Sequence, residues 1–147
     1  MLTIGVVDAG NVSGDLTTLT PDAQDPDWRC SPTSSFVLPS TDEVLARAEN
    51  GIDTPLGVYE AGTAVGFAMV RNENGQLRWF IADTERFQEV LTLVCRYVID
   101  TMGLIPWGVV EGTNNRLAAM WEHPNVGIES QRVVNNVLYT TVRWTGE

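Results

Sequence analysis

An apolar stripe at helical spacing near the middle of the chain constrains the fold more than any other feature. Its members recur at intervals of three and four residues, which places them on one face of an α-helix. Asp83 or Thr84 is expected to cap the start of this helix, and Gly103 suits its end because glycine adopts positive φ freely. Such a helix must bury its apolar face against other elements. The stripe consists of Phe87, Val90, Leu91, Val94, Cys95, Val98, Ile99 and Met102.

Strand patterns lie on both sides of this helix. Before it, turn residues such as Asn74-Gly75 separate short apolar runs, which predicts an antiparallel meander. In the last strand of the meander, Leu77 is expected on the face opposite Phe80, because side chains alternate along a strand. After the helix, one more strand and a hairpin around Asn135-Asn136 are predicted. The predicted strands are Leu56–Glu60, Ala64–Val70, Gln76–Ala82, Trp107–Glu111, Gly127–Val134 and Val137–Trp144.

Two shorter helices complete the pattern. Ser40 is followed three residues later by Glu43, which is capping-box spacing and predicts a helix over Thr41–Glu49 that ends at Asn50-Gly51. Another helix is predicted from Asn114 to Glu122. The order of elements indicates an α/β (α+β) fold, with a mixed central sheet, helices on both faces and a final antiparallel hairpin. The long helix and its two flanking strands should form a right-handed crossover with parallel strands.

The first 39 residues differ in composition from the rest of the chain. Met1 to Asp8 is expected to form one strand. The run that follows is rich in Thr, Ser, Asp and Pro, and little regular structure is expected there. We therefore divide the chain into an acidic, mostly irregular N-terminal arm, residues 1–39, and a folded domain, residues 40–147.

Charge and composition disfavour several classes of function. The net charge of −10 disfavours direct binding to nucleic acid or to an anionic membrane. Nine acids and two arginines give residues 1–57 a charge of −7, and ten acids and seven arginines give residues 58–147 a charge of −3. No membrane span or secretory signal is recognisable, so a cytoplasmic protein is expected. His123 is the one histidine, so a zinc site lacks ligands and no metal is expected.

The order of elements from Leu56 to Trp144, about 60% of the chain, resembles the GCN5-related N-acetyltransferase (GNAT) superfamily. The run Asn114–Glu122 and the following Gly127-Ile128 resemble the asparagine, aromatic-glutamate and glycine pattern of that family. The resemblance implies the GNAT fold and, in an active member, acetyl-CoA as the acyl donor. It then implies cofactor contacts from Ile81, Ala82, Arg86, Phe87, Gln88 and Asn114.

Candidate catalytic residues lie near strand ends. Glu60 and Glu111 are the candidates for a general base, although solvated carboxylates at strand ends are the simpler interpretation. Tyr139 is the candidate acid that protonates the departing thiolate, provided that the fold brings it close. His123 is interpreted as a residue at a helix end that interacts with carbonyl groups, rather than as an acid–base catalyst.

Two departures from the family pattern concern the chemistry. GNAT enzymes carry a glycine-rich loop before the long helix, whereas this chain has no glycine between Gly75 and Gly103. Acidic residues such as Asp83 and Glu89 lie there instead, and carboxylates repel a diphosphate. Trp121 stands where many family members have the tyrosine that acts as the acid. These departures favour a protein that has lost acetyl transfer and binds no cofactor.

The leading hypothesis is therefore a non-catalytic GNAT-like protein that acts through contacts with protein partners. The runs Trp79–Asp83, Pro106–Trp121 and Val137–Val142 also resemble small GNAT-like proteins of short-tailed bacteriophages. That resemblance implies a role in virion assembly or host interaction, with phage structural proteins as partners and the host cytoplasm or the virion as location. Homo-oligomerisation stays open.

Two alternatives make different structural predictions. An active N-acetyltransferase with a divergent cofactor loop requires a V-shaped gap between the strands at Arg78–Ala82 and Trp107–Glu111, with free backbone donors. An acidic mimic of nucleic acid, which would inhibit a host protein, requires the acids of residues 8–53 to form a row on one face.

Overall fold

The computed structural model describes residues 1–19, 40–82, 84–111 and 123–146 of the 147-residue chain. Several features singled out in the sequence therefore lie outside the described residues. They are Asp83, the helix predicted over Asn114–Glu122 with Trp121 within it, and three of the nine acids of residues 8–53, namely Asp22, Asp25 and Asp27.

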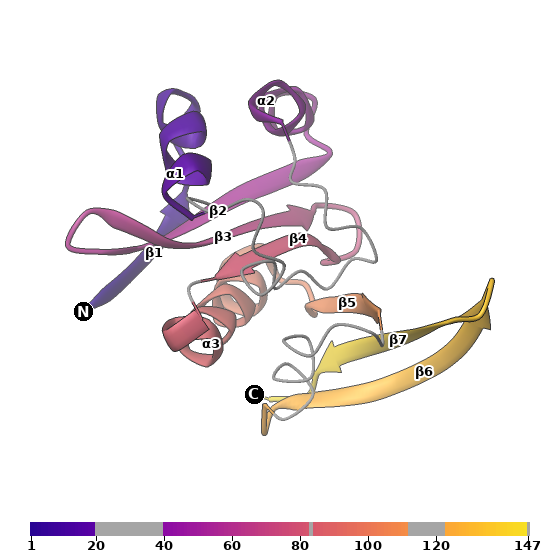
Figure 1. Ribbon diagram of the computed structural model, residues 1–147. Coiled ribbons are helices and arrows are strands. Elements are labelled where there is room, and N and C mark those ends of the chain that lie inside the picture. The colour runs from indigo at the N-terminus through magenta and orange to yellow at the C-terminus, as the bar shows by residue number, and fades with distance from the viewer. Residues whose placement is uncertain (20–39, 83, 112–122, 147) are drawn as a thin grey trace.

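The strands form two sheets, and all hydrogen-bonded neighbours within each sheet are antiparallel. Figure 1 shows the four-stranded sheet beside the smaller three-stranded one. The first has the order β1 (Leu2–Val6), β2 (Asp53–Glu60), β3 (Thr63–Arg71), β4 (Leu77–Ala82). The second has the order β5 (Trp107–Glu111), β7 (Val137–Trp144), β6 (Val126–Val134).

Helices cover both faces of the four-stranded sheet, as predicted (Figure 1). Two helices lie on one face, and the long helix lies on the other. Successive side chains of β3 point to opposite faces of the sheet, so β3 contributes to the core on both sides. Phe67 packs toward α1 and α2, whereas Ala68 packs toward α3. The helices are α1 (Val12–Leu19), α2 (Thr41–Glu49) and α3 (Phe87–Tyr97), with 3-10 turns at Ala9–Asn11 and Thr84–Arg86 and a π-helical turn at Val98–Met102.

The long amphipathic helix has the predicted position and orientation. Phe87, Val90 and Val94 of α3 are buried against the sheet, and each such side chain contributes about 1.5–3 kcal/mol of burial. Gly103 ends the helical segment with a φ of 69°, as expected for a C-terminal glycine. The start differs in detail, since Thr84–Arg86 form a 3-10 turn and Arg86 is the N-cap of α3.

Local turn and cap signals are confirmed. The hydroxyl of Ser40 accepts a hydrogen bond of 3.1 Å from the backbone N–H of Glu43, and the helix that follows spans Thr41–Glu49. The hairpin between β6 and β7 turns at Asn135 and Asn136, which adopt φ values of 50° and 65°. Asparagine tolerates this left-handed conformation better than other residues with a Cβ atom.

The N-terminal region is more ordered than its composition suggests. We predicted little regular structure after residue 8, but Val12–Leu19 form α1, so this prediction is wrong for that segment. Val12 and Leu16 are buried one helical turn apart, and β1 pairs with β2. The weak helix formers Gly14 and Thr18 hide the pattern from sequence reasoning. Residues 2–19 thus share a sheet and a core with the domain.

One side-chain direction in β4 is also corrected. The register of β3 with β4 shifts so that Val70 lies opposite Leu77. Leu77 therefore shares the α3 side of the sheet with Phe80, whereas a regular alternation predicted opposite faces. The extra residue in the bulge, Arg78, leaves the predicted positions of Trp79 and Ile81 unchanged.

No helix in the described part of the chain is long and apolar enough to cross a membrane.

Candidate functional site

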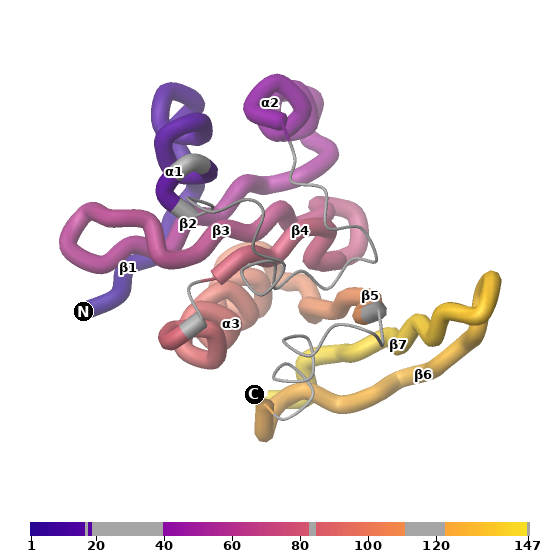
Figure 2. Tube along the Cα trace, in the orientation of Figure 1, coloured from indigo at the N-terminus to yellow at the C-terminus, as the bar shows by residue number. Residues whose placement is uncertain are grey.

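β4 and β5 diverge, and the separation between them is the central feature of the candidate site. A parallel bridge joins Gln76 to Trp107 where the two strands begin. Beyond this bridge the described strands form no ladder with each other, since β4 pairs with β3 and β5 pairs with β7. Each strand therefore directs the backbone groups of alternate residues toward the other strand without a strand partner. The predicted parallel direction is confirmed, and Figure 2 shows the crossover through α3.

Three contacts fix the closed end of this gap. The indole N–H of Trp107 donates to the carbonyl oxygen of Asn74 over 3.1 Å, so the ring points back at the β3–β4 turn. The backbone N–H of Trp144 donates to Pro106 over 3.0 Å. Gly75 has a φ of 81°, and a Cβ atom there would lie 2.7 Å from the carbonyl oxygen of Ile105. The turn thus needs glycine.

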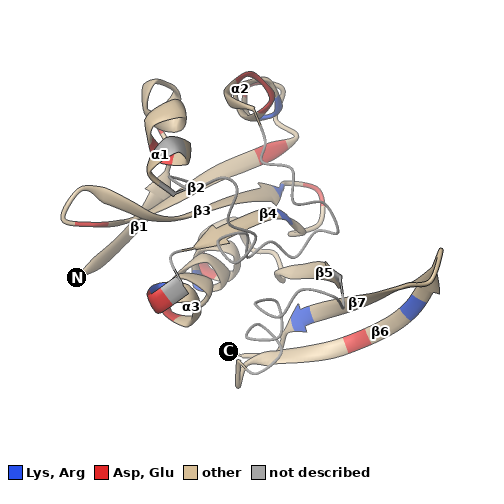
Figure 3. Ribbon diagram, in the orientation of Figure 1, with Lys and Arg blue, Asp and Glu red and all other residues tan. Residues whose placement is uncertain are grey.

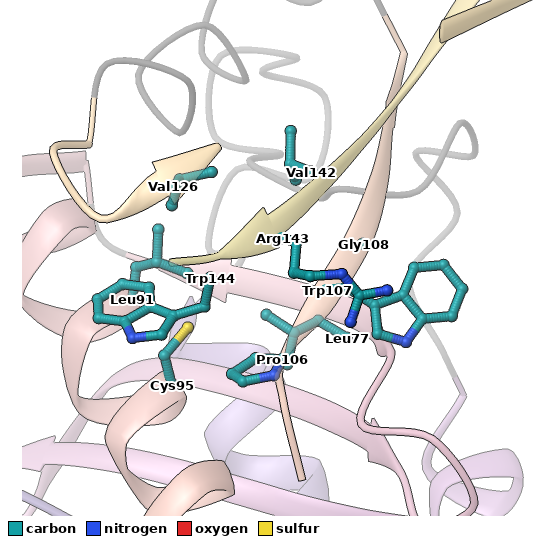
Figure 4. A pocket seen from close by; sticks show the side chains of 10 residues that line it. All are labelled: Leu77, Leu91, Cys95, Pro106, Trp107, Gly108, Val126, Val142, Arg143 and Trp144. Carbon is teal, nitrogen blue, oxygen red and sulfur yellow. The ribbon is translucent and has the colours of Figure 1, made fainter. Parts of the chain in front are cut away.

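A small apolar cavity of about 20 Å³ lies beside the closed end. Figure 4 shows Leu91, Cys95 and Trp144 close together at one end of it, and Leu77 beside Pro106 and Trp107. A space of this size accommodates about one water molecule. The cavity is therefore a packing defect where the two sheets meet, too small for a larger ligand.

The start of α3 lies at the open end of the gap. Arg86 bridges two acids there: Nη2 lies 2.5 Å from Oε2 of Glu60, and Nη1 lies 3.5 Å from Oε2 of Glu89. Figure 3 shows acidic and basic residues together at this helix end. No described side chain caps α3 at Arg86. The 3-10 turn Thr84–Arg86 leads directly into α3 at this point.

The other predicted cofactor residues surround the same place. Ile81 and Ala82 are buried at the end of β4. Phe87 is buried and meets Phe80 edge to face, with ring centroids 5.4 Å apart. Gln88 is exposed on the first turn of α3. Asn114 lies outside the described residues.

The fold brings two of the candidate catalytic residues together and separates the third. Glu111 at the end of β5 is the register partner of Tyr139 in β7, which places their Cα atoms about 4.5–5.5 Å apart. Because β5 runs parallel to β4, Glu111 lies at the same edge of the molecule as Ala82. Glu60 instead forms the ion pair with Arg86.

His123 forms a structural link and is buried at 5% exposure. Its Nδ1 atom accepts from the backbone N–H of Asn125 over 3.1 Å, so Nε2 carries the proton and contacts the hydroxyl of Thr92 at 2.9 Å. The pKa of His123 is lowered because burial penalises the charged ring, and a backbone hydrogen bond at Gln88 opposes this shift. The ring also packs against Trp144, with centroids 5.1 Å apart. This geometry connects the second sheet to α3.

Sequence reasoning missed the contact between Asp15 and Tyr59. The phenol of Tyr59 donates to Asp15 over 2.5 Å, and burial together with this carboxylate raises the pKa of Tyr59. The two residues are 44 positions apart, and no local pattern marks them as partners.

Comparison with known proteins gives a clear result for the fold alone. No protein-family model matches the sequence, and no curated protein matches it. Among solved structures, a GNAT-family acetyltransferase from Streptococcus pneumoniae aligns with a TM-score of 0.65 at 13% identity, covering 99% of this chain and 100% of that one. The chain has the GNAT acetyltransferase fold. This confirms the predicted fold class.

Two further structures with the GNAT fold are enzymes by description. A putative acetyltransferase from Salmonella typhimurium, solved with acetyl-CoA, aligns with a TM-score of 0.67 at 12% identity and covers 99% of this chain and 95% of that one. The ribosomal-protein-S18-alanine N-acetyltransferase of Escherichia coli aligns with a TM-score of 0.60 at 15% identity, over 98% of this chain and 93% of that one.

These neighbours contradict our leading hypothesis of a non-catalytic bacteriophage protein, which is wrong. The error came from judging the cofactor site by its missing glycines. In the structure, β4 and β5 form no ladder with each other beyond one bridge, and no described side chain caps α3 at Arg86. The active alternative required the first of these features, strands at Arg78–Ala82 and Trp107–Glu111 that are not fully paired.

Proposed function

We propose that this protein is a GNAT-type N-acetyltransferase that transfers the acetyl group of acetyl-CoA to an amine. The separation of β4 from β5 beyond the Gln76–Trp107 bridge carries the proposal. Two neighbouring parallel strands would normally close a ladder, because unpaired backbone groups are costly when water cannot reach them. Open edges in this place suit a ligand that supplies its own amide groups.

The pantetheine arm of acetyl-CoA is such a ligand. Its amides can pair with the backbone groups of β4 and β5 in the way that an extended peptide adds to a sheet edge. The arm enters from the end where the strands are farther apart, which is also the end where α3 begins. Glu111 and its register partner Tyr139 lie at this same end of the gap.

The diphosphate then lies near the start of α3. Backbone N–H groups at a helix N-terminus and the helix dipole favour an anion there. Arg86 is the cation at this position, and its guanidinium is about one-third exposed. A diphosphate competes with Glu60 and Glu89 for the guanidinium of Arg86. Glu60 and Glu89 therefore lower the affinity for acetyl-CoA relative to a site where Arg86 has no acidic partner.

The reaction needs two proton transfers, and one is assigned to Glu111 and the other to Tyr139. The amine nitrogen attacks the carbonyl carbon of the thioester, and the new C–N bond forms as the C–S bond breaks. Glu111 takes the proton that the amine loses, and Tyr139 donates a proton to the departing thiolate. Solvent then restores both residues. His123 has no part in these transfers, because it is buried and both ring nitrogens are engaged.

Steady-state kinetics with acetyl-CoA and a panel of peptide and small amines test the assignment. Glu111→Gln and Tyr139→Phe should each lower kcat by about 10²–10⁴-fold, with the affinity for acetyl-CoA unchanged. The exposed residue Asp100, past the end of α3, provides the control, since Asp100→Asn should leave both constants unchanged. Wild-type kinetics for both catalytic variants would refute the assignment of these two residues.

The cofactor contact is tested separately by two variants with opposite effects. Arg86→Ala should weaken binding of acetyl-CoA by about 10–100-fold, since a charge-assisted contact is worth about 1.5–3 kcal/mol. Glu60→Gln releases Arg86 from its 2.5 Å ion pair and should tighten binding by a few fold. If Glu60→Gln weakens binding as much as Arg86→Ala does, the ion pair is part of the site and not a competitor for it.

A further inference from the structure

The outer edge of the second sheet is not explained by acetyl transfer. β6 has β7 on one side and no described strand on the other. Every residue of β6 from Ile128 to Val134 is exposed, and the side chains of Ile128 and Val133 are exposed by 57% and 67%. The β6–β7 hairpin extends away from the body of the molecule, so another chain can reach this edge (Figure 1). An exposed strand edge with apolar side chains is a template for pairing with a further strand.

The charge of the hairpin differs from that of the whole protein. The net charge is −10, so two copies of the chain repel each other over most of their surface. β6 and β7 together contain one acid, Glu129, and two arginines, Arg132 and Arg143, which gives +1. The hairpin therefore lacks the excess of acids that keeps two copies apart elsewhere.

A β-bulge decides which side chains of β6 share a face. The register with β7 shifts at Glu129, so that Ile128 lies opposite Val142 and Ser130 lies opposite Thr141. The ion pair between Glu129 and Arg143 places this acid on the face that carries Ser130. The face of Val142 carries Ile128, Gln131 and Val133, and the opposite face carries Glu129, Ser130, Arg132 and Val134.

Two copies of β6 fit each other when they pair antiparallel around a two-fold axis at Gln131. Such an axis keeps paired side chains on the same face of the joined sheet. One residue outward from the axis, Arg132 of one copy lies opposite the bulge at Glu129 of the other. One residue further, Val133 lies opposite Ile128. Each contact occurs twice, so the dimer gains two pairs of opposite charge and two apolar pairs, and both kinds stabilise neighbouring strands.

The charges also select this register. Moving the axis to Arg132 would set the two copies of this arginine directly opposite each other, and like charges in that position are destabilising. Moving it to Val133 would set Arg132 opposite Val134 and away from any acid of β6. Charged side chains on an edge strand normally resist pairing. In β6 their order along the strand favours one partner, which is a second β6.

We propose that β6 is the interface of a homodimer, in which the β6 strands of two copies pair antiparallel and join their three-stranded sheets into one continuous sheet. The inference does not rest on acetyl transfer, because exposure, register and charge of the hairpin carry it. A single strand from each copy forms a small interface, which is typical of weak and reversible association. The expected dissociation constant is about 10–100 μM.

Sedimentation equilibrium of the full-length protein tests the dimer, at concentrations from about 1 μM to about 500 μM. The expected result is a reversible equilibrium between monomer and dimer. Larger oligomers that grow with concentration would contradict the proposal, because a two-fold interface closes after two copies. A wild-type chain that stays monomeric would overturn it and leave the edge to a different partner.

Charge reversal identifies the strand and its register. Glu129→Arg and Arg132→Glu should each raise the dissociation constant at least about tenfold, because each variant sets like charges opposite one another twice in the dimer. An equimolar mixture of the two variants should associate again with about wild-type affinity, because every such contact in the mixed dimer joins an acid to an arginine. The recovery also shows that both variants are folded.

Glu73→Arg provides the matched control. It makes the same change of charge as Glu129→Arg, at a side chain that is 76% exposed in the turn between β3 and β4, and should leave dimerisation unchanged. Variants of Glu129 and Arg132 that dimerise like the wild type would refute β6 as the interface. A mixture that stays monomeric would refute the pairing of these two residues.

Discussion

The two sheets differ in how completely they are covered, and the candidate site lies at the boundary between them. β3 in the first sheet is buried over five consecutive residues, Gly66–Val70, whereas β6 in the second is exposed from Ile128 to Val134. Helices pack on both faces of the first sheet, while the β6–β7 hairpin extends away from the body (Figure 1). Stability is therefore concentrated in β1–β4, and the second sheet is held mainly at its inner end.

The largest expected effect comes from truncating a buried side chain in the first sheet, compared with an exposed one in the second. Phe67 is fully buried in β3, so Phe67→Ala should lower the free energy of unfolding by about 3–5 kcal/mol. Val133 is 67% exposed at the end of β6, so Val133→Ala should change it by less than about 0.5 kcal/mol. Urea denaturation of both variants measures the difference. Similar losses would show that the hairpin is not a peripheral element.

The next effect concerns the contact that joins the sheets. Gly75 and Gly62 both have a φ of 81°, but a Cβ atom at Gly75 meets Ile105 at 2.7 Å, whereas nothing described lies within 4 Å of one at Gly62. Gly62→Ala should cost about 1–2 kcal/mol from backbone strain alone. Gly75→Ala should cost about 1–3 kcal/mol more because the turn must move from Ile105. Thermal unfolding of the pair compares them, and equal costs would mean that the sheets do not depend on this close approach.

His123, which links the second sheet to α3, makes the free energy of unfolding depend on pH. Its folded-state pKa is lowered by burial, so the unfolded chain binds the proton more readily. This contribution to stability is complete above the unfolded pKa of about 6.5 and is lost as the pH falls toward the folded value. Unfolding at about pH 7.5 and about pH 5.5 should therefore show a loss that His123→Asn reduces. An unchanged pH profile in that variant would remove His123 as the cause.

The smallest effect lies on the exposed hairpin. Arg143 and Glu129 form an ion pair of 3.2 Å across β7 and β6, with both side chains well exposed. Because water screens such a pair, Glu129→Gln should change the unfolding free energy by less than about 1 kcal/mol. Denaturation at low and high salt checks this. A loss as large as that of Gly75→Ala would contradict the view that the hairpin contributes little.

Local signals in the sequence predicted much of the fold. The Ser40 cap, the α3 stripe and the Asn135-Asn136 turn depend on neighbouring residues, so their patterns are legible without the structure. The helix α1 was missed because Gly14 and two threonines weaken its local signal. The Leu77 bulge depends on the register with β3, which no single strand encodes.

The candidate site was harder to predict because it depends on two neighbouring strands, β4 and β5, that do not form a hydrogen-bonded ladder. No residue in β4 or β5 indicates that these strands separate after one bridge. The missing glycines before α3 were visible, and they suggested a lost cofactor site. The pairing of Glu111 with Tyr139 joins residues that are distant in the sequence and follows from the hairpin register alone.

The central claim is that the open edges between β4 and β5 receive acetyl-CoA. Calorimetric titration of the full-length protein with acetyl-CoA tests it most directly, with backbone NMR at Ile81, Ala82 and Gly108 to locate the ligand. We predict one site per chain, a dissociation constant between about 1 μM and about 1 mM, and shifts at these strand residues. An absence of binding in that range, or binding that leaves β4 and β5 unshifted, would contradict the claim.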